Sequence, residues 1–244
     1  MHHFWGIRQG TDVALLEDEA RHAQKVLRLN DGDVVRILDG LGSAWEGPLH
    51  FLGKKGAVVA NATERPNYGA VSGYLHLVIA PTKNLDRIEW LLEKAVELGV
   101  HKVTLAECDR SERRHLKVDR LVRVMQAACK QSQKGMLPAL EGPRPFREVL
   151  AGVHGRTALA ALRPETVFLP ELLRAHPEEA WTVFIGPEGD FTDREVAEAV
   201  AHGAILVGLG PHRLRTETAG MYAVAAFAQR TAKVRPEQPL KRVF

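Results

Sequence analysis

The sequence has few features that would indicate a secreted, membrane-bound or metal-binding protein. Only two of its 244 residues are cysteines, Cys108 and Cys129, and they do not form a metal-ligand spacing. So little cysteine is typical of a protein in a reducing cytoplasm. No apolar run approaches the roughly 18 residues of a membrane span, and the first residues, from Met1 to Trp5, do not resemble a secretory signal. We therefore expect a cytoplasmic protein without a membrane segment.

Several catalytic signatures are also absent. No glycine-rich loop is followed by the lysine and Ser/Thr of a phosphate-binding loop. The run Gly208-Leu209-Gly210 begins like a dinucleotide fingerprint, but Arg213 stands where the third glycine is needed. A nucleophile elbow and a histidine- or cysteine-rich metal motif are both missing. These absences disfavour kinase, hydrolase and metalloenzyme functions, and we expect no bound metal.

Positive charge is concentrated in one part of the chain. The formal net charge is only +3, but basic residues crowd the segment between Arg110 and Lys134. Such a cluster is compatible with contacts to the phosphates of a nucleic acid. A solvated helix face explains the same pattern equally well.

Residues 1–68 have the pattern of a small β barrel. Short apolar strands alternate with glycine turns after a helix over Glu17–Leu27; the expected strands cover residues 34–38, 43–52 and 56–62. Basic side chains of this segment, among them Arg28, either grip a nucleic acid or are ordinary surface charge. The stretch Glu64–Gly73, which is rich in glycine and also contains Pro66, is the best candidate for a linker.

Residues 74–244 alternate between strand and helix patterns, which indicates an α/β domain with a mainly parallel sheet. Asn84–Leu98 carries a helical apolar stripe that Gly99 ends, and Lys117–Lys134 forms a longer basic helix. The last helix, from about Glu217 to Lys233, is apolar on most sides. Such a helix is buried by more than one neighbour, and a subunit interface is a natural place for part of its surface.

The stretch from Trp181 to Gly220 organises the second domain. An apolar strand over residues 181–185 ends in Gly186-Pro187-Glu188-Gly189, and Thr192 with Glu195 forms a capping box that starts a helix. A second strand over residues 204–207 ends in Gly208-Leu209-Gly210-Pro211. We expect the two strands to be parallel neighbours, so that their loops form a ligand site at one edge of the sheet. Backbone groups of such loops suit a flat heterocycle such as adenine, although two ordinary tight turns are the alternative.

The residues of these loops resemble a known family. Ile185–Glu195 reads Ile-Gly-Pro-Glu-Gly-Asp-Phe-Thr-x-x-Glu, and Leu209–Ala219 reads Leu-Gly-Pro-x-Arg-Leu-Arg-Thr-Glu-Thr-Ala. This pair resembles the RsmE-type rRNA uridine methyltransferases of the SPOUT superfamily. Segments over residues 26–33, 93–100 and 127–132 match the same family in the same order. The chain departs from the family pattern at Asp190, where a glycine is usual, and at Lys130 and Lys134, where glutamate and arginine are usual.

The resemblance implies a fold and an activity. The fold would be a PUA-like N-terminal barrel that binds RNA, followed by a SPOUT α/β domain with a deep trefoil knot. The activity would be transfer of a methyl group from S-adenosylmethionine to N3 of a uridine in small-subunit (16S) ribosomal RNA by a homodimer. Two alternatives remain: a methyltransferase of this type acting on another RNA site, and a non-catalytic RNA-binding protein with a degenerate pocket.

The resemblance also assigns site residues by position. The cofactor pocket would comprise Leu162, Ile185, Gly186, Pro187, Glu188, Gly189, Leu209, Gly210, Leu214, Arg215, Thr216, Thr218 and Ala219. Arg215 is the candidate that stabilises negative charge on the uracil, and Glu217 is a candidate base or positioning residue. Both could instead anchor a helix start, where an acid is favourable in any case. The RNA contacts would be Arg28, Arg113, Arg114 and Lys134, which attract phosphate rather than select a base.

Overall fold

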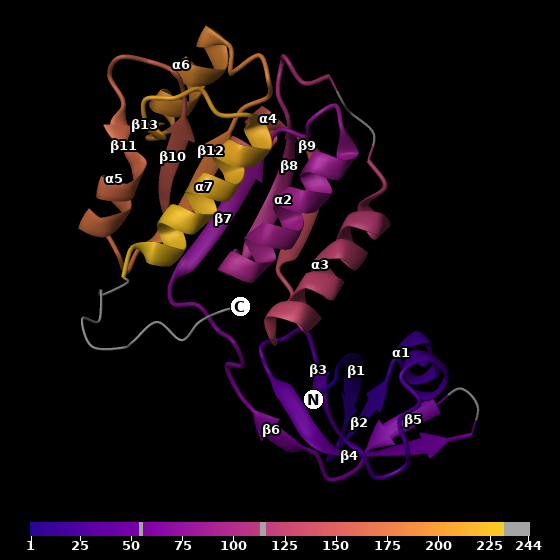
Figure 1. Ribbon diagram of the computed structural model, residues 1–244. Coiled ribbons are helices and arrows are strands. Elements are labelled where there is room, and N and C mark those ends of the chain that lie inside the picture. Colours follow the sequence, from indigo (N-terminus) through magenta and orange to yellow (C-terminus); the bar gives the residue numbers. More distant parts are fainter. Residues whose placement is uncertain (54–55, 113–115, 232–244) are drawn as a thin grey trace.

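The computed structural model describes residues 1–53, 56–112 and 116–231, and these fold around two separate β-sheets (Figure 1). The first sheet is built from the strands up to Arg65, and the second from the strands that begin at Tyr74. The expected division into residues 1–68 and 74–244 follows this arrangement, and we propose it as the domain organisation. Arg65 itself pairs with Ala44 in the first sheet, so the connection between the sheets is shorter than the expected linker.

The N-terminal sheet closes into the barrel that the turn pattern predicts. Its strands follow the order β3-β1-β2-β5-β4-β6, and β3 also pairs with β4, which completes the ring. The strands are β1 (His3–Gln9), β2 (Asp12–Leu15), β3 (Val34–Leu38), β4 (Ala44–Leu52), β5 (Gly56–Val59) and β6 (Thr63–Arg65). Phe4, Ile37 and Leu49 fill the interior. The single helix expected over Glu17–Leu27 is α1 (Glu17–Arg21) followed by a π-helical turn over His22–Val26.

The C-terminal sheet has seven strands, and every pairing within it is parallel. The order is β11-β13-β10-β12-β7-β8-β9. The strands are β7 (Tyr74–Ile79), β8 (Lys102–Glu107), β9 (Ala139–Pro145), β10 (Arg156–Ala160), β11 (Val167–Phe168), β12 (Ala180–Ile185) and β13 (Ile205–Gly208). The expected α/β fold with a parallel sheet is confirmed. The trefoil knot stays a prediction.

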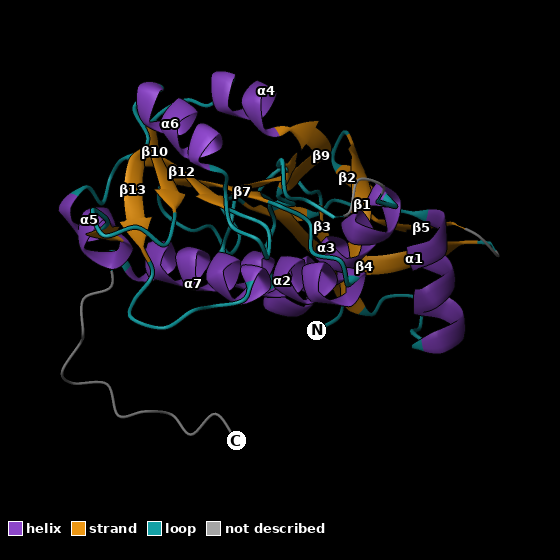
Figure 2. Ribbon diagram, turned by 90° about the horizontal axis from the view of Figure 1, so that it is seen from above, coloured by secondary structure: helices purple, strands orange, loops and turns teal. Residues whose placement is uncertain are grey.

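Helices cover both faces of this sheet (Figure 2). One face carries α2 (Leu85–Leu98), α3 (Val118–Ser132), α5 (Leu169–Ala175) and α7 (Thr216–Gln229), and the other carries α4 (Phe146–Ala151) and α6 (Asp193–Ala201). Leu91 of α2, Trp181 of β12 and Phe227 of α7 belong to one buried cluster. Phe146 and Phe191 belong to the cluster on the opposite face. Apolar side chains therefore fill both sides of the parallel strands, as such sheets require.

The expectation that the strands before the two glycine loops are neighbours is wrong. β10 lies between them, because Ala158 pairs with Val183 of β12 on one side and with Ile205 of β13 on the other. A short apolar run does not specify its partner strand, since any buried strand offers the same hydrogen-bonding edge. Strands are spaced about 4.8 Å apart, so the two loops are separated by roughly 10 Å. The end of β10 forms the floor between them.

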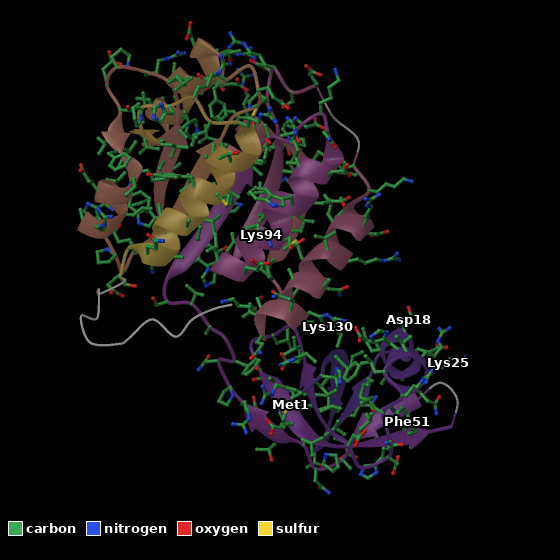
Figure 3. The ribbon with its side chains drawn as sticks, viewed as in Figure 1. Met1, Asp18, Lys25, Phe51, Lys94 and Lys130 are labelled. Atoms are coloured by element: carbon green, nitrogen blue, oxygen red, sulfur yellow. The ribbon has the colours of Figure 1, made fainter. Side chains whose placement is uncertain are left out.

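Helix α3 attaches the barrel to the α/β domain. Lys130, labelled in Figure 3, forms an ion pair of 2.5 Å with Glu19 of α1. The indole Nε1 of Trp5 in β1 donates a hydrogen bond to the carbonyl oxygen of Gln126 at 3.2 Å. The hydroxyl of Tyr68, in the connection between the sheets, donates to Oε1 of Gln133 at 3.0 Å. These contacts fix the barrel beside the basic helix.

Candidate cofactor pocket

The first glycine loop is shaped by close packing and by one left-handed residue. A Cβ on Gly186 would come within 3.1 Å of the Phe191 ring, so only glycine fits there without a shift. Asp190 has φ +62°, in the region that favours glycine. Its backbone N–H donates to the carbonyl of Pro187 at 2.9 Å, and its Oδ1 accepts from the N–H of Phe191 at 2.8 Å. These local hydrogen bonds explain how aspartate occupies a position where the resemblance leads us to expect glycine.

The second loop follows β13 and leads directly into α7. Gly210 has φ +118°, a conformation that side-chain-bearing residues rarely adopt. Arg215 is the N-cap residue of α7, so the helix begins at Thr216, one residue before the expected start. The Thr216 hydroxyl donates to the carbonyl oxygen of Gly186 at 3.1 Å. This bond ties the start of α7 to the first loop.

A cavity of about 690 Å³ lies between the two loops, above the end of β10. Eleven of the thirteen predicted cofactor residues line it: Leu162, Ile185, Gly186, Pro187, Glu188, Leu209, Gly210, Leu214, Arg215, Thr216 and Ala219. Gly189 and Thr218 are not among its lining residues. Sequence reasoning missed the other side of the cavity, which includes Arg163 and Thr166 in the segment after β10. That segment carries no local motif, and it reaches the cavity only because β10 is inserted between β12 and β13.

Three arginines surround the cavity, and they differ in how they are held. Arg163 forms an ion pair with Asp193 at 2.6 Å, and Arg213 donates to the backbone oxygen of Glu188 at 3.4 Å. The exposed guanidinium of Arg215 forms no hydrogen bond or ion pair with side chains or backbone in the described part of the chain. Arg215 is therefore the cation that remains available to a ligand.

The first loop is braced from behind by residues after β8. Arg110 donates from Nη1 to the carbonyl oxygen of Gly189 at 2.7 Å. The backbone N–H of Asp109 donates to Oε1 of Glu195 at 2.9 Å, and the other oxygen of Glu195 accepts from the N–H of Thr192. The predicted capping box of α6 is thus confirmed, and its glutamate also holds the neighbouring loop.

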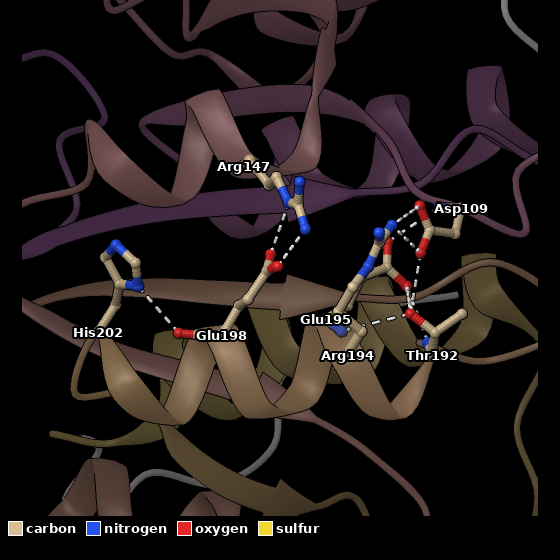
Figure 4. Close-up of polar contacts among 7 residues, drawn as sticks. All are labelled: Asp109, Arg147, Thr192, Arg194, Glu195, Glu198 and His202. Atoms are coloured by element: carbon tan, nitrogen blue, oxygen red, sulfur yellow. Dashed lines mark hydrogen bonds and ion pairs between the residues drawn. The ribbon is translucent and has the colours of Figure 1, made fainter.

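Ion pairs extend this brace along α6 (Figure 4). Arg194 contacts both carboxylate oxygens of Asp109, at 2.9 and 2.8 Å. One turn further along α6, Arg147 of α4 forms a two-point pair with Glu198, and the hydrogen bond from Arg147 lowers the pKa of Glu198. The loop that borders the cavity is therefore fixed to a rigid helix rather than free in solvent.

The predicted catalytic pair is not brought together at the cavity. Arg215 lines it, whereas Glu217 does not and is 8% exposed. Oε1 of Glu217 lies 3.7 Å from Nε of Arg87 on α2. The structure thus places Glu217 against α2 and outside the cavity lining.

The predicted RNA contacts have different surroundings. Arg28 is exposed and has φ +54°, just after the π-helical turn of the barrel. Lys134 donates to the carbonyl oxygen of Gly69 at 3.3 Å, and burial lowers the pKa of its ammonium group. Lys134 therefore supports the connection between the sheets, and its RNA contact stays a prediction. Arg113 and Arg114 lie outside the described residues.

Two further findings concern only the described residues. They contain no group of three or more His, Cys, Asp or Glu side chains arranged to hold a metal ion. None of their helices combines the length and the apolar character needed to cross a membrane.

Taken together, the fold and the cavity define an α/β protein that binds a ligand at the carboxyl ends of parallel strands and carries an accessory β barrel. Comparison with known proteins narrows this class. A family model described as "RNA methyltransferase domain" matches residues 72–228, and one described as "RNA methyltransferase PUA domain" matches residues 15–60. The chain belongs to this family of RNA methyltransferases.

Relatives along the whole chain agree with this assignment. The "Ribosomal RNA small subunit methyltransferase E" of Synechocystis sp. is 29% identical over 87% of this chain and 71% of its own. Among solved structures, a probable rRNA-methyltransferase from Porphyromonas gingivalis is 33% identical, with a TM-score of 0.82 over 92% of this chain and 95% of its own. The ribosomal RNA small subunit methyltransferase E of Neisseria gonorrhoeae, whose structure contains S-adenosyl methionine, is 28% identical, with a TM-score of 0.82 over 93% and 96%.

Proposed function

We propose that this protein transfers the methyl group of S-adenosylmethionine to N3 of a uridine in small-subunit ribosomal RNA. The observation that carries the proposal is the cavity between the two glycine loops, because both family motifs converge on it from strands that are not adjacent. The names of the relatives support the RNA substrate, and the gonococcal structure supports the cofactor.

The residues present fit S-adenosylmethionine. A cavity of about 690 Å³ falls within the size range of small-ligand sites. Ile185, Leu209 and Leu214 supply apolar walls, and Gly186 and Gly210 let the backbone approach a flat ring without an intervening Cβ. When bound, the cofactor supplies a methyl group on a positively charged sulfur, which a nucleophilic nitrogen attacks.

Arg215 has the strongest case for a catalytic role. N3 of uracil normally carries a proton, and loss of that proton places negative charge on the ring. A guanidinium already in place at the cavity stabilises that charge without reorganisation of solvent. The pairing edge of the base must also be exposed, which requires the base to leave its stack.

The barrel and the basic helix would receive the rest of the RNA. Arg28 on the barrel is exposed and suited to phosphate, which positions the substrate without reading its sequence. We retain Lys134 as a weaker candidate, because it is already engaged with Gly69. Arg113 and Arg114 remain candidates from the sequence alone.

We infer further that the protein is a cytoplasmic homodimer. Helix α7 is apolar on most sides, yet Met221, Tyr222 and Ala225 stay partly exposed. Trp90 of the neighbouring helix α2 is 41% exposed. A second copy would cover this apolar surface, and sedimentation of the purified protein at micromolar concentration tests the inference.

Incubation of small ribosomal subunits and of free small-subunit RNA with labelled S-adenosylmethionine tests the proposed activity. We expect label in the RNA of at least one of these substrates. Arg215→Ala should lower the rate on the order of a hundredfold, as removal of a charge-stabilising donor does in other enzymes. Binding of the cofactor without transfer to either substrate would favour another RNA target. Failure to bind the cofactor in calorimetry would favour the non-catalytic alternative.

A further inference from the structure

A second depression adjoins the cofactor cavity. Its volume is about 560 Å³, and its lining residues are Lys83, Asn84, Leu85, Arg87, Glu112 and Glu188. Glu188 lines both spaces, so they adjoin at this residue. A group held in the depression would therefore lie next to the ligand of the first cavity.

The loop that forms this depression is fixed in place. It joins β7 to α2, whose N-cap is Asn84, with a side chain that accepts from the N–H of Asp86 at 3.0 Å. The Thr82 hydroxyl donates to the backbone oxygen of Asn84 at 2.7 Å. The N–H of Lys83 donates to Oε1 of Glu188 at 3.3 Å, which links the helix-start segment directly to the first glycine loop.

Glu217 and Arg87 are only partly satisfied in this arrangement. The Glu217 side chain is 10% exposed, and its Oε2 is buried without a hydrogen-bond partner among the described residues. Its Oε1 lies 3.7 Å from Nε of Arg87, which is too long for a hydrogen bond. A buried carboxylate oxygen without a partner is costly, so it favours closer approach of Arg87.

Arg87 lies between the Glu217 carboxylate and the depression, so Glu217 can position its guanidinium there. Its side chain is 38% exposed, and the Glu217 contact is its only ion pair in the described residues. The planar guanidinium has five N–H donors, so it can face Glu217 with Nε and still present its terminal nitrogens to an oxyanion. Lys83 provides a second positive charge at the same depression, where it forms an ion pair of 3.1 Å with Glu112, and the positive end of the α2 dipole points the same way.

We propose that this depression binds the phosphate of the nucleotide that receives the methyl group, through Arg87 and Lys83, and that Glu217 positions Arg87 instead of removing the N3 proton. A phosphate would replace Glu112 as the partner of Lys83, and Arg87 can bind it at two points. Because the two spaces adjoin at Glu188, a nucleotide anchored here would direct its base toward the cofactor cavity. The inference rests on the proposed function, since it assumes that RNA is the methyl acceptor.

Steady-state methyl transfer to small subunits by Arg87→Ala tests the proposal. Binding of S-adenosylhomocysteine and the unfolding midpoint are measured on the same sample. We expect kcat/KM for RNA to fall roughly tenfold to a hundredfold, mainly through KM, while the cofactor product binds as in the wild type. Arg87→Lys keeps a charge but loses the planar guanidinium, so its kcat/KM for RNA should lie between the values of the wild type and of Arg87→Ala.

Arg156→Ala is the matched control. Arg156 is the first residue of β10, at the end of the strand away from the cofactor cavity; its side chain is 35% exposed and pairs with Glu179. Arg156→Ala thus removes a similar ion pair away from both cavities, and the kcat/KM of this variant for RNA should stay at the wild-type value. Values for Arg87→Ala and Arg87→Lys within about twofold of this control would overturn the phosphate site.

A double-mutant cycle tests the role of Glu217. Glu217→Gln alone should raise KM, but in the Arg87→Ala background it should cause no further loss, because its effect passes through Arg87. Independent, multiplicative losses would show that Glu217 acts on the substrate itself and would overturn the positioning role. If the wild-type enzyme transfers no methyl group to any RNA, the proposed function is contradicted. If the wild type is active and the Arg87 variants are equally active, only the phosphate site is contradicted.

Discussion

Substitution of Gly210 by alanine separates backbone geometry from side-chain contact at the cofactor pocket. Gly210 has φ +118°, and a Cβ at this position would meet no atom within 4 Å. The substitution therefore causes no clash, and its whole effect is backbone strain. Strain of a residue in the left-handed region is about 1–2 kcal/mol, of which the lower entropy of the unfolded alanine chain offsets about 0.5 kcal/mol.

Gly203→Ala is a matched control for this strain. Gly203 follows α6 and has φ +85°, and a Cβ added to it would likewise meet no atom within 4 Å. It does not line the cavity. We expect Gly203→Ala to lower the free energy of unfolding by about 1 kcal/mol and to leave cofactor affinity unchanged.

Gly210→Ala should instead weaken cofactor binding. Gly210 is exposed, so its loop can relax to a less strained shape, and binding must then restore the strained one. Strain of about 1–2 kcal/mol corresponds to a dissociation constant raised roughly fivefold to thirtyfold. Calorimetry with S-adenosylhomocysteine and chemical unfolding of both variants provide the test. Wild-type affinity in Gly210→Ala would refute the view that this backbone conformation forms part of the cofactor site.

Three further predictions concern the brace, the buried histidine and the helix cap. Arg110→Ala removes the hydrogen bond to Gly189 and should weaken cofactor binding several-fold with little change in stability, whereas unchanged calorimetric affinity would exclude the brace. Burial, with a smaller effect of Lys102, lowers the pKa of His76 to about 4. Between pH 6.5 and 4, His76 is therefore protonated in the unfolded chain but largely neutral in the folded chain. Stability should therefore fall by about 3 kcal/mol between pH 6.5 and 4, and urea titrations of His76→Gln should lack this component. Glu195→Gln keeps the shape of the capping box but loses its charge, and should lower the free energy of unfolding by about 1 kcal/mol; no change in urea unfolding would contradict the dual role of Glu195.

Helix caps and glycine motifs in the sequence correctly predicted the helix ends and loops that nearby residues determine. Asn84 and Gly99 bound α2 because an amide side chain caps the first turn and a glycine takes the left-handed conformation at the end. The capping box of Thr192 and Glu195 starts α6 for the same kind of reason. Most of the cofactor residues predicted from the two glycine motifs line the cavity, because the loop residues themselves form its walls.

Properties set by distant partners were not predictable in this way. The place of β10 between β12 and β13 depends on the packing of the whole sheet, and no residue of Arg156–Ala160 indicates it. β9 contains Pro143 and Pro145, which disfavour a strand, yet it pairs as the edge of the sheet where missing N–H groups are tolerated. Arg110 and Gly189 meet across 79 residues of sequence. Glu217 looked like a group at the reaction centre, because its neighbours in the motif line the cavity while its own side chain turns to α2.

The chemical identity of the methylated nucleoside tests the central claim most directly. Small-subunit RNA, free and in assembled subunits, is treated with the enzyme and labelled S-adenosylmethionine and then digested to nucleosides for mass spectrometry. The proposed function predicts that the label is in 3-methyluridine and that Arg215→Ala strongly reduces it. Label in any other nucleoside, with no 3-methyluridine from either substrate, would contradict the proposed reaction.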